Sequence, residues 1–172
     1  MEAVTTPKGT NEEILQRMIV QYQTELLRMC YLYLQDTSLA EDAVQETFLR
    51  AYRAIQDFRG ESSEKTWLIR ISINICRDMQ RSAWLRHIDR RITPDMLPEA
   101  SVAFEARDEE LIMSVMNLPV KLREAILLYY FQNMSVKEIA ASLGISSPTV
   151  SNRLKRATKK LRIVLEGGHY YE

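Results

Sequence analysis

The sequence predicts an all-α fold, with two small helical domains joined by an acidic linker, the C-terminal one a helix-turn-helix. Apolar residues recur three and four positions apart through most of the chain, and no segment shows a sustained strand alternation. Residues 93–102 contain two prolines and no sustained period, which separates two helical parts. We place the domains at residues 11–92 and 111–166 and the linker at 93–110.

Charge is distributed unevenly along the 172 residues, although the net charge is zero. Residues 94–118 carry six acidic side chains and one basic one, whereas residues 119–172 carry nine basic and four acidic ones. A basic C-terminal part beside an acidic middle indicates partners better than the total does. The asymmetry favours a nucleic-acid partner for the C-terminal domain.

Composition excludes several other classes. Cys30 and Cys76 lie in apolar helical runs with no second Cys or His at ligand spacing, so we expect reduced core residues, no metal site and no cofactor. No stretch approaches the roughly 18 apolar residues of a membrane span, and the first ten residues have no apolar signal core. We therefore expect a cytoplasmic protein with no direct membrane insertion.

The N-terminal domain is expected to begin with two helices. Residues 11–34 have apolar side chains at helical spacing, with Asn11 as the expected N-cap. Ser38 and Glu41 form an S-x-x-E pattern that predicts a capping box opening a second helix, residues 40–55. Its outward ridge is polar and acidic: Asp42, Gln45, Glu46 and Arg53. Its expected apolar side consists of Ala43, Val44, Phe48, Leu49, Tyr52 and Ile55.

A loop at residues 58–65 leads into a third helix, residues 64–86. Its expected core stripe is Trp67, Leu68, Ile71, Ile75 and Met79. Its polar stripe has spacings of 4, 3 and 4 residues and consists of Arg70, Asn74, Arg77 and Arg81. Arginine binds phosphate and aromatic rings stack on exposed bases, so this face suits a nucleic-acid strand. A solvated helix face is the alternative that the stripe leaves open.

The C-terminal domain is predicted to contain four helices. One ends near Asn117, and a second covers residues 120–131 with Leu122, Ile126, Leu127 and Tyr130 as core. Ser135 can cap a third helix that ends at Gly144, which supplies a left-handed residue. The pair Ser147 and Pro148 predicts an N-cap followed by the first turn of the fourth helix. Two short helices meeting at a glycine are typical of a helix-turn-helix.

The fourth helix can be examined by its angles, at about 100° per residue. Its apolar positions fall on one side: Val150, Leu154, Ala157 and Leu161. Its outward positions are polar or cationic: Ser151, Asn152, Lys155, Arg156 and Lys159. Six Lys or Arg and no Asp or Glu lie between residues 146 and 163, so this face is expected to attract phosphates. A solvated amphipathic helix is the simpler alternative.

Four segments in this order resemble one family. They are AEDAVQETFLRAY at 40–52, FRGESSEKTWLIRISINICRD at 58–78, LPVKLREAILLYYF at 118–131, and the helix-turn-helix at 135–162. Together they resemble bacterial RNA polymerase sigma factors of the extracytoplasmic-function (ECF) group, which keep only the second and fourth conserved regions. The resemblance covers residues 11–165 and implies promoter-specific initiation of transcription.

The resemblance also implies partners and site residues. The partners would be core RNA polymerase, through its β′ clamp helices and β flap, promoter DNA, and an anti-sigma factor; no small-molecule substrate is implied. Residues matching the −35 contacts are Ser147, Thr149, Ser151, Asn152, Arg153, Lys155, Arg156 and Lys159. Residues matching the −10 contacts are Arg59, Ser62, Ser63, Lys65, Trp67, Arg70, Asn74 and Arg77. Residues matching the polymerase contacts are Asp42, Gln45, Glu46 and Arg50.

The chain departs from the family pattern at two places. Glu64 and Lys65 stand where many relatives have aromatic or apolar residues, and Ser151 stands where a basic residue is common. These departures leave the captured −10 base and the −35 sequence open. The acidic linker would thread the nucleic-acid channel of the polymerase or fold back on the basic domain.

Three other functions are weighed against a sigma factor. A helix-turn-helix regulator would bind duplex DNA without acting as a polymerase subunit, but residues 11–92 show no strand alternation for a sensor domain. An enzyme is disfavoured because no nucleophile and base pair, P-loop or metal set is found. A helical adaptor with a basic face is the third.

Overall fold

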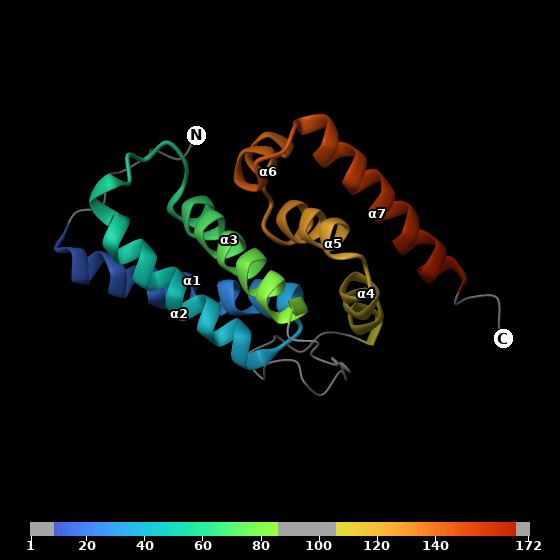
Figure 1. Cartoon of the computed structure of the whole chain (residues 1–172), viewed down its shortest axis with the longest axis horizontal. Helices are drawn as coiled ribbons and strands as arrows, with labels where there is room; N and C mark the ends of the chain where they lie inside the picture. The colour runs from blue at the N-terminus through green and yellow to red at the C-terminus, as the bar shows by residue number, and fades with distance from the viewer. Residues whose placement is uncertain (1–8, 86–105, 168–172) are drawn as a thin grey trace. The chain divides into compact units, whose positions relative to one another are not determined.

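The computed structural model describes residues 9–85 and 106–167, and these residues form helices and turns without a strand. The all-α prediction is confirmed. The chain divides into two compact units, Met1–Arg90 and Arg91–Glu172 (Figure 1). Most of the predicted acidic linker, residues 93–105, lies outside the described residues, and its last five residues belong to a helix. In the described ranges, no helix combines the length and the apolar character needed to cross a membrane.

The first unit is built from α1 (Asn11–Leu34), α2 (Thr37–Ala54), the 3₁₀ turn η1 (Ile55–Asp57) and α3 (Glu64–Leu85). Each of the three long helices packs against the other two (Figure 1). Their facing sides are apolar, and fully buried residues include Met18, Leu34, Leu68 and Ile73. Each such side chain stabilises the unit by roughly 1.5–3 kcal/mol relative to an exposed one.

The first two helices are not capped where the sequence predicted. The side chain of Thr10, not Asn11, accepts from the Glu13 amide at 3.3 Å, and the Glu13 carboxylate accepts from the Thr10 amide at 3.0 Å. Asp36 caps α2 through the Leu39 amide at 2.9 Å, so α2 begins three residues before the predicted start. The capping box predicted at Ser38 is therefore wrong. The reason is that α1 ends in a left-handed residue, Gln35 (φ 59°), which turns the chain at once.

The second unit contains α4 (Ala106–Met116), α5 (Val120–Ile126), the π-helical turn η3 (Leu127–Phe131), α6 (Val136–Leu143) and α7 (Ser147–Gly167). Helix α7 packs against α4, α5 and α6, so it is the element that holds this unit together. The predicted sequence of helices is confirmed, although residues 120–131 form an α-helix followed by a π turn.

The π turn changes which side chains are buried. The Gln132 amide donates to the Leu127 carbonyl at 3.1 Å, five residues back, where an α-helix would reach four. This wider turn buries Leu127, Leu128 and Gln132 and rotates Tyr130 outward, to 57% exposure. The prediction of Tyr130 as a core residue is wrong because it assumed an unbroken α-helical period.

The corner between α6 and α7 has the predicted glycine. Ser135 and Glu138 form a capping box at the start of α6, and Gly144 ends it with φ 65°. A Cβ at Gly144 would meet nothing within 4 Å, so the backbone angle alone favours glycine there, by roughly 1–2 kcal/mol. The N-cap of α7 is Ser146 rather than Ser147, because its hydroxyl accepts from the Thr149 amide at 3.3 Å.

A buried ion pair joins α5 to α7. The Arg153 Nη1 atom donates to the Glu124 Oε1 atom at 2.7 Å, and the two side chains are 14% and 3% exposed. On the preceding residue, the buried Arg123 guanidinium donates to the Met116 carbonyl at the end of α4. Two adjacent residues of α5 therefore attach it to helices on either side.

We expect Glu124→Gln to lower the free energy of unfolding of this unit by about 3 kcal/mol, because Arg153 would keep its charge in a largely buried place. Hydrogen exchange of the α5 and α7 amides in the intact chain, at increasing urea concentration, measures this change. The control is Lys121→Gln on the exposed face of α5, expected to change the value by less than about 0.5 kcal/mol. Unchanged exchange in Glu124→Gln would contradict a stabilising role for the pair.

Candidate nucleic-acid interface

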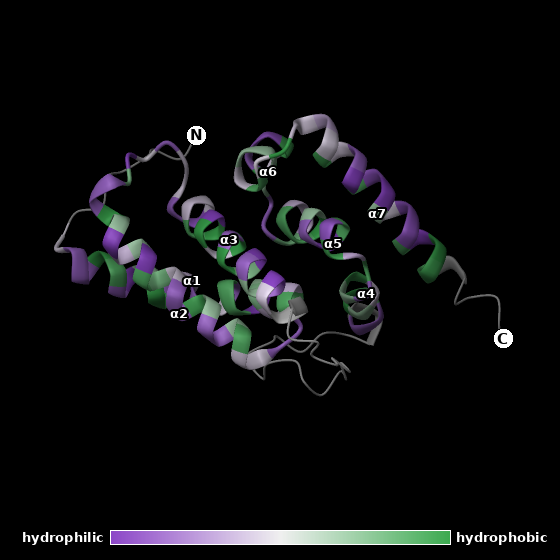
Figure 2. Cartoon of the chain, viewed as in Figure 1, coloured by the Kyte–Doolittle hydropathy of each residue, from purple (hydrophilic) through white to green (hydrophobic). Residues whose placement is uncertain are grey.

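The outward face of α7 is arranged as predicted. Ser151, Asn152 and Lys155 are exposed, whereas Val150 and Ala157 are fully buried. Further along the helix, Arg156 and Lys159 are also exposed. Figure 2 shows hydrophilic positions recurring along α7. The face has the charge and the side-chain length to contact phosphates and base edges in a DNA groove.

Three other predicted residues at this helix differ in their surroundings. Thr149 is exposed, and its hydroxyl lies 2.8 Å from the Ser146 hydroxyl. Ser147 is the first residue of the helix and half-buried. Arg153 departs from the predicted phosphate contact because its guanidinium is largely buried against Glu124. Arg153 is three residues after the buried Val150, so helical spacing places it near the side of α7 that packs on the unit. Its charge is accommodated there because Glu124 of α5 binds it.

The polar stripe of α3 is accessible. Asn74 is exposed, and Arg70 and Arg77 are half-buried. The Asn74 amide group donates to the Arg70 carbonyl at 2.9 Å, which holds this side chain along the helix. Arg81 forms an ion pair with Asp78 at 2.8 Å.

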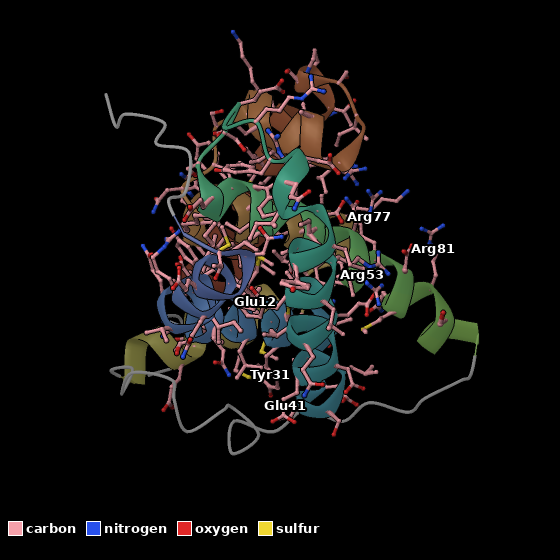
Figure 3. All side chains as sticks on the ribbon, turned by 90° about the vertical axis from the view of Figure 1, so that its left-hand side faces the viewer. Glu12, Tyr31, Glu41, Arg53, Arg77 and Arg81 are labelled. Atoms are coloured by element: carbon pink, nitrogen blue, oxygen red, sulfur yellow. The ribbon has the colours of Figure 1, made fainter. Side chains whose placement is uncertain are left out.

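A further exposed arginine, Arg53, lies on α2, which packs against α3. Figure 3 shows the labelled Arg53, Arg77 and Arg81 projecting on the same side of the view. Sequence reasoning placed Arg53 on the outward side of α2 without connecting it to α3, because periodicity within one helix does not show which neighbouring face lies next to it. The surface therefore draws cations from two helices.

The loop before α3 is held at its ends by local contacts. The rings of Phe58 and Trp67 lie 4.8 Å apart at 35°, so half-buried Trp67 packs under the loop. The Ser63 hydroxyl accepts from the Thr66 amide at 3.1 Å and thereby caps α3. Arg59 is exposed and Ser62 is half-buried. Of the predicted loop contacts, Arg59 and Ser63 are thus exposed, and the Ser63 hydroxyl is engaged in the cap.

Residues of α1 reach the same loop. The Arg17 guanidinium binds both oxygens of the Glu64 carboxylate, at 2.7 and 2.8 Å, and the Lys65 ammonium group lies 2.6 Å from Glu25. The Glu64 carboxylate raises the pKa of Arg17 through these hydrogen bonds. Sequence reasoning missed Arg17 and Glu25, because no local pattern links residues more than 35 positions apart.

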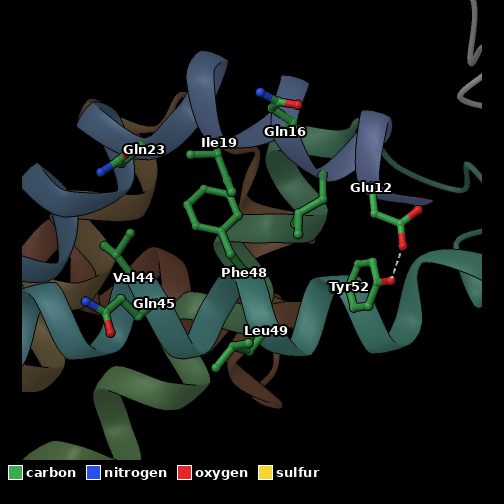
Figure 4. A pocket seen from close by; sticks show the side chains of 10 residues that line it. Glu12, Gln16, Ile19, Gln23, Val44, Gln45, Phe48, Leu49 and Tyr52 are labelled. Carbon is green, nitrogen blue, oxygen red and sulfur yellow. Dashed lines mark hydrogen bonds between the residues drawn. The ribbon is translucent and has the colours of Figure 1, made fainter. Parts of the chain in front are cut away.

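The polar ridge of α2 borders an apolar groove. Asp42 and Gln45 are exposed, and Glu46 forms an ion pair with Arg50 at 2.6 Å. The groove lies between α1 and α2 and has a volume of about 570 Å³ (Figure 4). Its apolar walls consist of Leu15, Ile19, Val44, Phe48 and Leu49. Leu49, which the sequence placed on the buried side, is 52% exposed because it lies at the edge of the groove.

One hydrogen bond closes the end of this groove. The Tyr52 hydroxyl donates to the Glu12 Oε1 atom at 2.7 Å, which joins the end of α2 to the start of α1 (Figure 4). The bond lowers the pKa of Glu12 and raises the pKa of Tyr52, because it favours the carboxylate and the protonated phenol.

The two cysteines are free and buried, and the Cys30 sulfur lies 3.1 Å from the Ser72 hydroxyl. The prediction that they are reduced core residues is confirmed. Among the described side chains, no three His, Cys, Asp or Glu converge in a way that could hold a metal ion.

Both surfaces fall within segments that match known protein families. Residues 18–86 match the family model of Sigma-70 region 2, and residues 108–161 match that of Sigma-70 region 4. These two matches cover more than half of the chain. The chain belongs to the ECF group of the sigma-70 family. This ECF sigma factor carries its α3 stripe in region 2 and its α7 face in region 4, which disfavours a regulator that lacks the polymerase-binding region.

Curated relatives agree with this assignment. The ECF sigma factor is 33% identical to RNA polymerase sigma factor NccH of Alcaligenes xylosoxydans over 73% of each chain. It is 30% identical to the ECF sigma factor SigW of Bacillus subtilis, over 82% of this chain and 83% of the relative. It is 28% identical to the sigma-H factor of Pseudomonas aeruginosa, over 87% and 84%.

Solved structures show the same fold. CnrH, in complex with the cytosolic domain of CnrY, is 26% identical with a TM-score of 0.65, over 91% of this chain and 90% of that one. The sigma factor RpoE of Bartonella quintana, in complex with the anti-sigma factor NepR, is 21% identical with a TM-score of 0.75, over 90% and 98%. The second likeness concerns the fold alone.

We expect Tyr52→Phe to raise the pKa of Glu12 toward its ordinary value of 4.5, because the variant lacks the donor that favours the carboxylate. Because folding lowers the pKa of Glu12, its carboxylate stabilises the fold above pH 4.5, and this contribution is lost as the pH falls through the folded-state pKa. In Tyr52→Phe, the free energy of unfolding should therefore depend less steeply on pH in the acid range. NMR titration of the Glu12 carboxyl group measures the shift. Tyr129→Phe, in the other unit, should leave it unchanged, and an unmoved Glu12 titration in Tyr52→Phe would contradict this assignment.

Proposed function

We propose that this ECF sigma factor binds core RNA polymerase and directs initiation at promoters by recognising a −10 and a −35 element. One observation carries the proposal. The two DNA-suited faces lie in different units, each within its own sigma-70 region. The functional domains would be residues 11–92 and 111–166, with residues 93–110 as the acidic linker between them.

Recognition of the −35 element is assigned to α7. Asn152 and Ser151 project from the exposed face with short polar groups suited to base edges, as an asparagine amide can make two hydrogen bonds to adenine. Lys155, Arg156 and Lys159 supply the charge for phosphates. Thr149 and the first amides of the helix favour a phosphate at its N-terminus. Arg153 is left out, since it is bound to Glu124.

Recognition of the −10 element is assigned to the α3 stripe and its loop. Arg70, Asn74 and Arg77 would hold the backbone of the non-template strand, with Arg53 extending the cationic surface. The loop side chains Arg59 and Ser62 would contact an unstacked base, whereas the Lys65 ammonium group is bound to Glu25. The half-buried Trp67 supports the loop by packing on Phe58. Unstacking a base costs a few kcal/mol, which these contacts offset.

Polymerase docking is assigned to the ridge of Asp42, Gln45, Glu46 and Arg50. The apolar groove beside Gln45 adds a surface that a helix can bury, which polar residues alone would not provide. The β′ clamp helices are the partner that the family resemblance assigns to this ridge, and the β flap is the one assigned to the second unit.

An anti-sigma factor is the proposed regulator. CnrH and the Bartonella RpoE were each solved with a partner protein, named an anti-sigma factor for RpoE. The present chain would be covered in the same way, in the cytoplasm where polymerase and promoter are found. Sigma factors are regulators rather than enzymes, and this chain would catalyse no reaction of its own, leaving RNA synthesis to the polymerase.

The decisive experiment is in vitro transcription with core RNA polymerase on a promoter library. We expect the chain plus core enzyme to start RNA at a defined class of promoters, and core enzyme alone to show no such preference. Binding of duplex DNA by the free chain, together with no promoter-specific initiation in the presence of core enzyme, would instead identify a duplex-binding regulator.

Two variants of α7 separate base reading from phosphate binding. Asn152→Ala should cost about 1–3 kcal/mol at one position of the −35 element and relax its sequence preference. Lys159→Ala should weaken binding to all sequences equally and reduce the slope of log affinity against log salt by about 1. Both are measured with holoenzyme on −35 variants at several salt concentrations. Lys121→Ala on α5 is the charge-matched control for Lys159→Ala. An equal loss of affinity for all −35 variants in Asn152→Ala would exclude base reading by Asn152.

A further inference from the structure

The first turn of α3 is attached to α1 by two ion pairs. Both guanidinium nitrogens of Arg17 reach the Glu64 carboxylate, at 2.7 and 2.8 Å. The next residue, Lys65, reaches Glu25 at 2.6 Å. Glu64 and Lys65 are the first two residues of α3, and together with loop residues 59–63 they form the segment called loop 59–65, which leads into the polar stripe. No residue of α1 was assigned to promoter recognition.

The two pairs fix both the position and the rotation of this turn. Arg17, Gln21 and Glu25 are four residues apart on one ridge of α1, and Arg17 also donates to Gln21 at 3.4 Å. Arg17 and Glu25 are therefore about 12 Å apart along the helix axis. The two pairs have opposite charge order, because a cation of α1 binds Glu64 and an anion of α1 binds Lys65. A slide or rotation of the turn would break both pairs together.

The geometry of the two ion pairs indicates that they orient the first turn of α3 more than they stabilise the fold. Glu64 is 16% exposed and is bound by a two-pronged guanidinium, which restricts its direction. The Lys65 and Glu25 side chains are 32% and 39% exposed, a setting in which ion pairs add little to stability. A contact that adds little stability yet fixes an angle is suited to placing a neighbouring loop.

We propose that Arg17 and Glu25 are positioning residues that set the orientation of loop 59–65 for capture of the −10 strand. The loop is held at its other end by Phe58, which packs on Trp67. With both ends fixed, the exposed Arg59 and the half-buried Ser62 would meet the strand in one arrangement. The inference rests on the proposed −10 function of this loop.

Charge swapping tests the proposal, because positioning and direct attraction of DNA predict opposite changes in affinity for the variants that add positive charge, Glu64→Arg and Glu25→Lys. The measurement is the affinity of holoenzyme for a fluorescent single-stranded −10 oligonucleotide, with a −35 duplex as the second probe. Arg17→Glu makes the site more negative and Glu64→Arg makes it more positive. The double variant Arg17→Glu/Glu64→Arg keeps the net charge and reverses the pair.

We expect both single variants to weaken binding of the −10 strand roughly fivefold, which corresponds to the loss of one such ion pair. The double variant should return to within about twofold of the original affinity. Glu25→Lys should also weaken binding, although it adds positive charge near the DNA. Affinity for the −35 duplex should not change in any of them. Val20→Glu, 83% exposed on α1, is the control for added negative charge and should bind normally.

Three outcomes would overturn the proposal. Tighter binding by Glu64→Arg or Glu25→Lys would show that charge acts directly on the DNA. A double variant as weak as the single ones would show that the pair itself is not what matters. Equal losses of −10 affinity, core-polymerase affinity and unfolding midpoint would show a general structural defect. If the unaltered holoenzyme fails to bind the −10 strand, the proposed function itself fails, and this inference with it.

Discussion

A carboxylate that is 3% exposed, that of Glu124, constrains the whole second unit. A buried charge without a partner is strongly unfavourable, so α7 is held where Arg153 can reach it. That requirement sets the rotation of α7 as well as its place. Because Arg153 must face inward, Asn152 and Lys155, which lie about 100° and 160° from it around the helix axis, are directed to solvent. The interaction that fixes the helix thus also selects the face it presents.

The helices and their faces were predictable, and the exact ends were not. Apolar spacing located each helix because burial of one side dominates the energetics of a small helical unit. The caps at Asp36 and Ser146 were missed, since neighbouring serines had equal capping ability and the path of the backbone decided between them. The role of Arg153 could not be predicted because its partner lies 29 residues earlier in the chain.

The first unit depends on polar contacts between distant segments more than its sequence suggests. Arg17 and Glu64 are 47 positions apart, and Tyr52 and Glu12 are 40 apart. Each pair joins the end of one helix to another helix. The stripe on α3 was visible from spacing alone, whereas the contribution of Arg53 and the groove beside α2 required the packing of two helices.

The π turn at Leu127–Phe131 gives the second unit one residue more than a regular helix of the same span would hold. A related chain could lose that residue and still begin its next helix in the same place, so the turn absorbs a length difference locally. A sequence comparison across this segment should therefore allow a one-residue gap here. Tyr129 and Tyr130 lie in this π turn and are exposed, whereas Leu127 and Leu128 of the same turn are buried in the core.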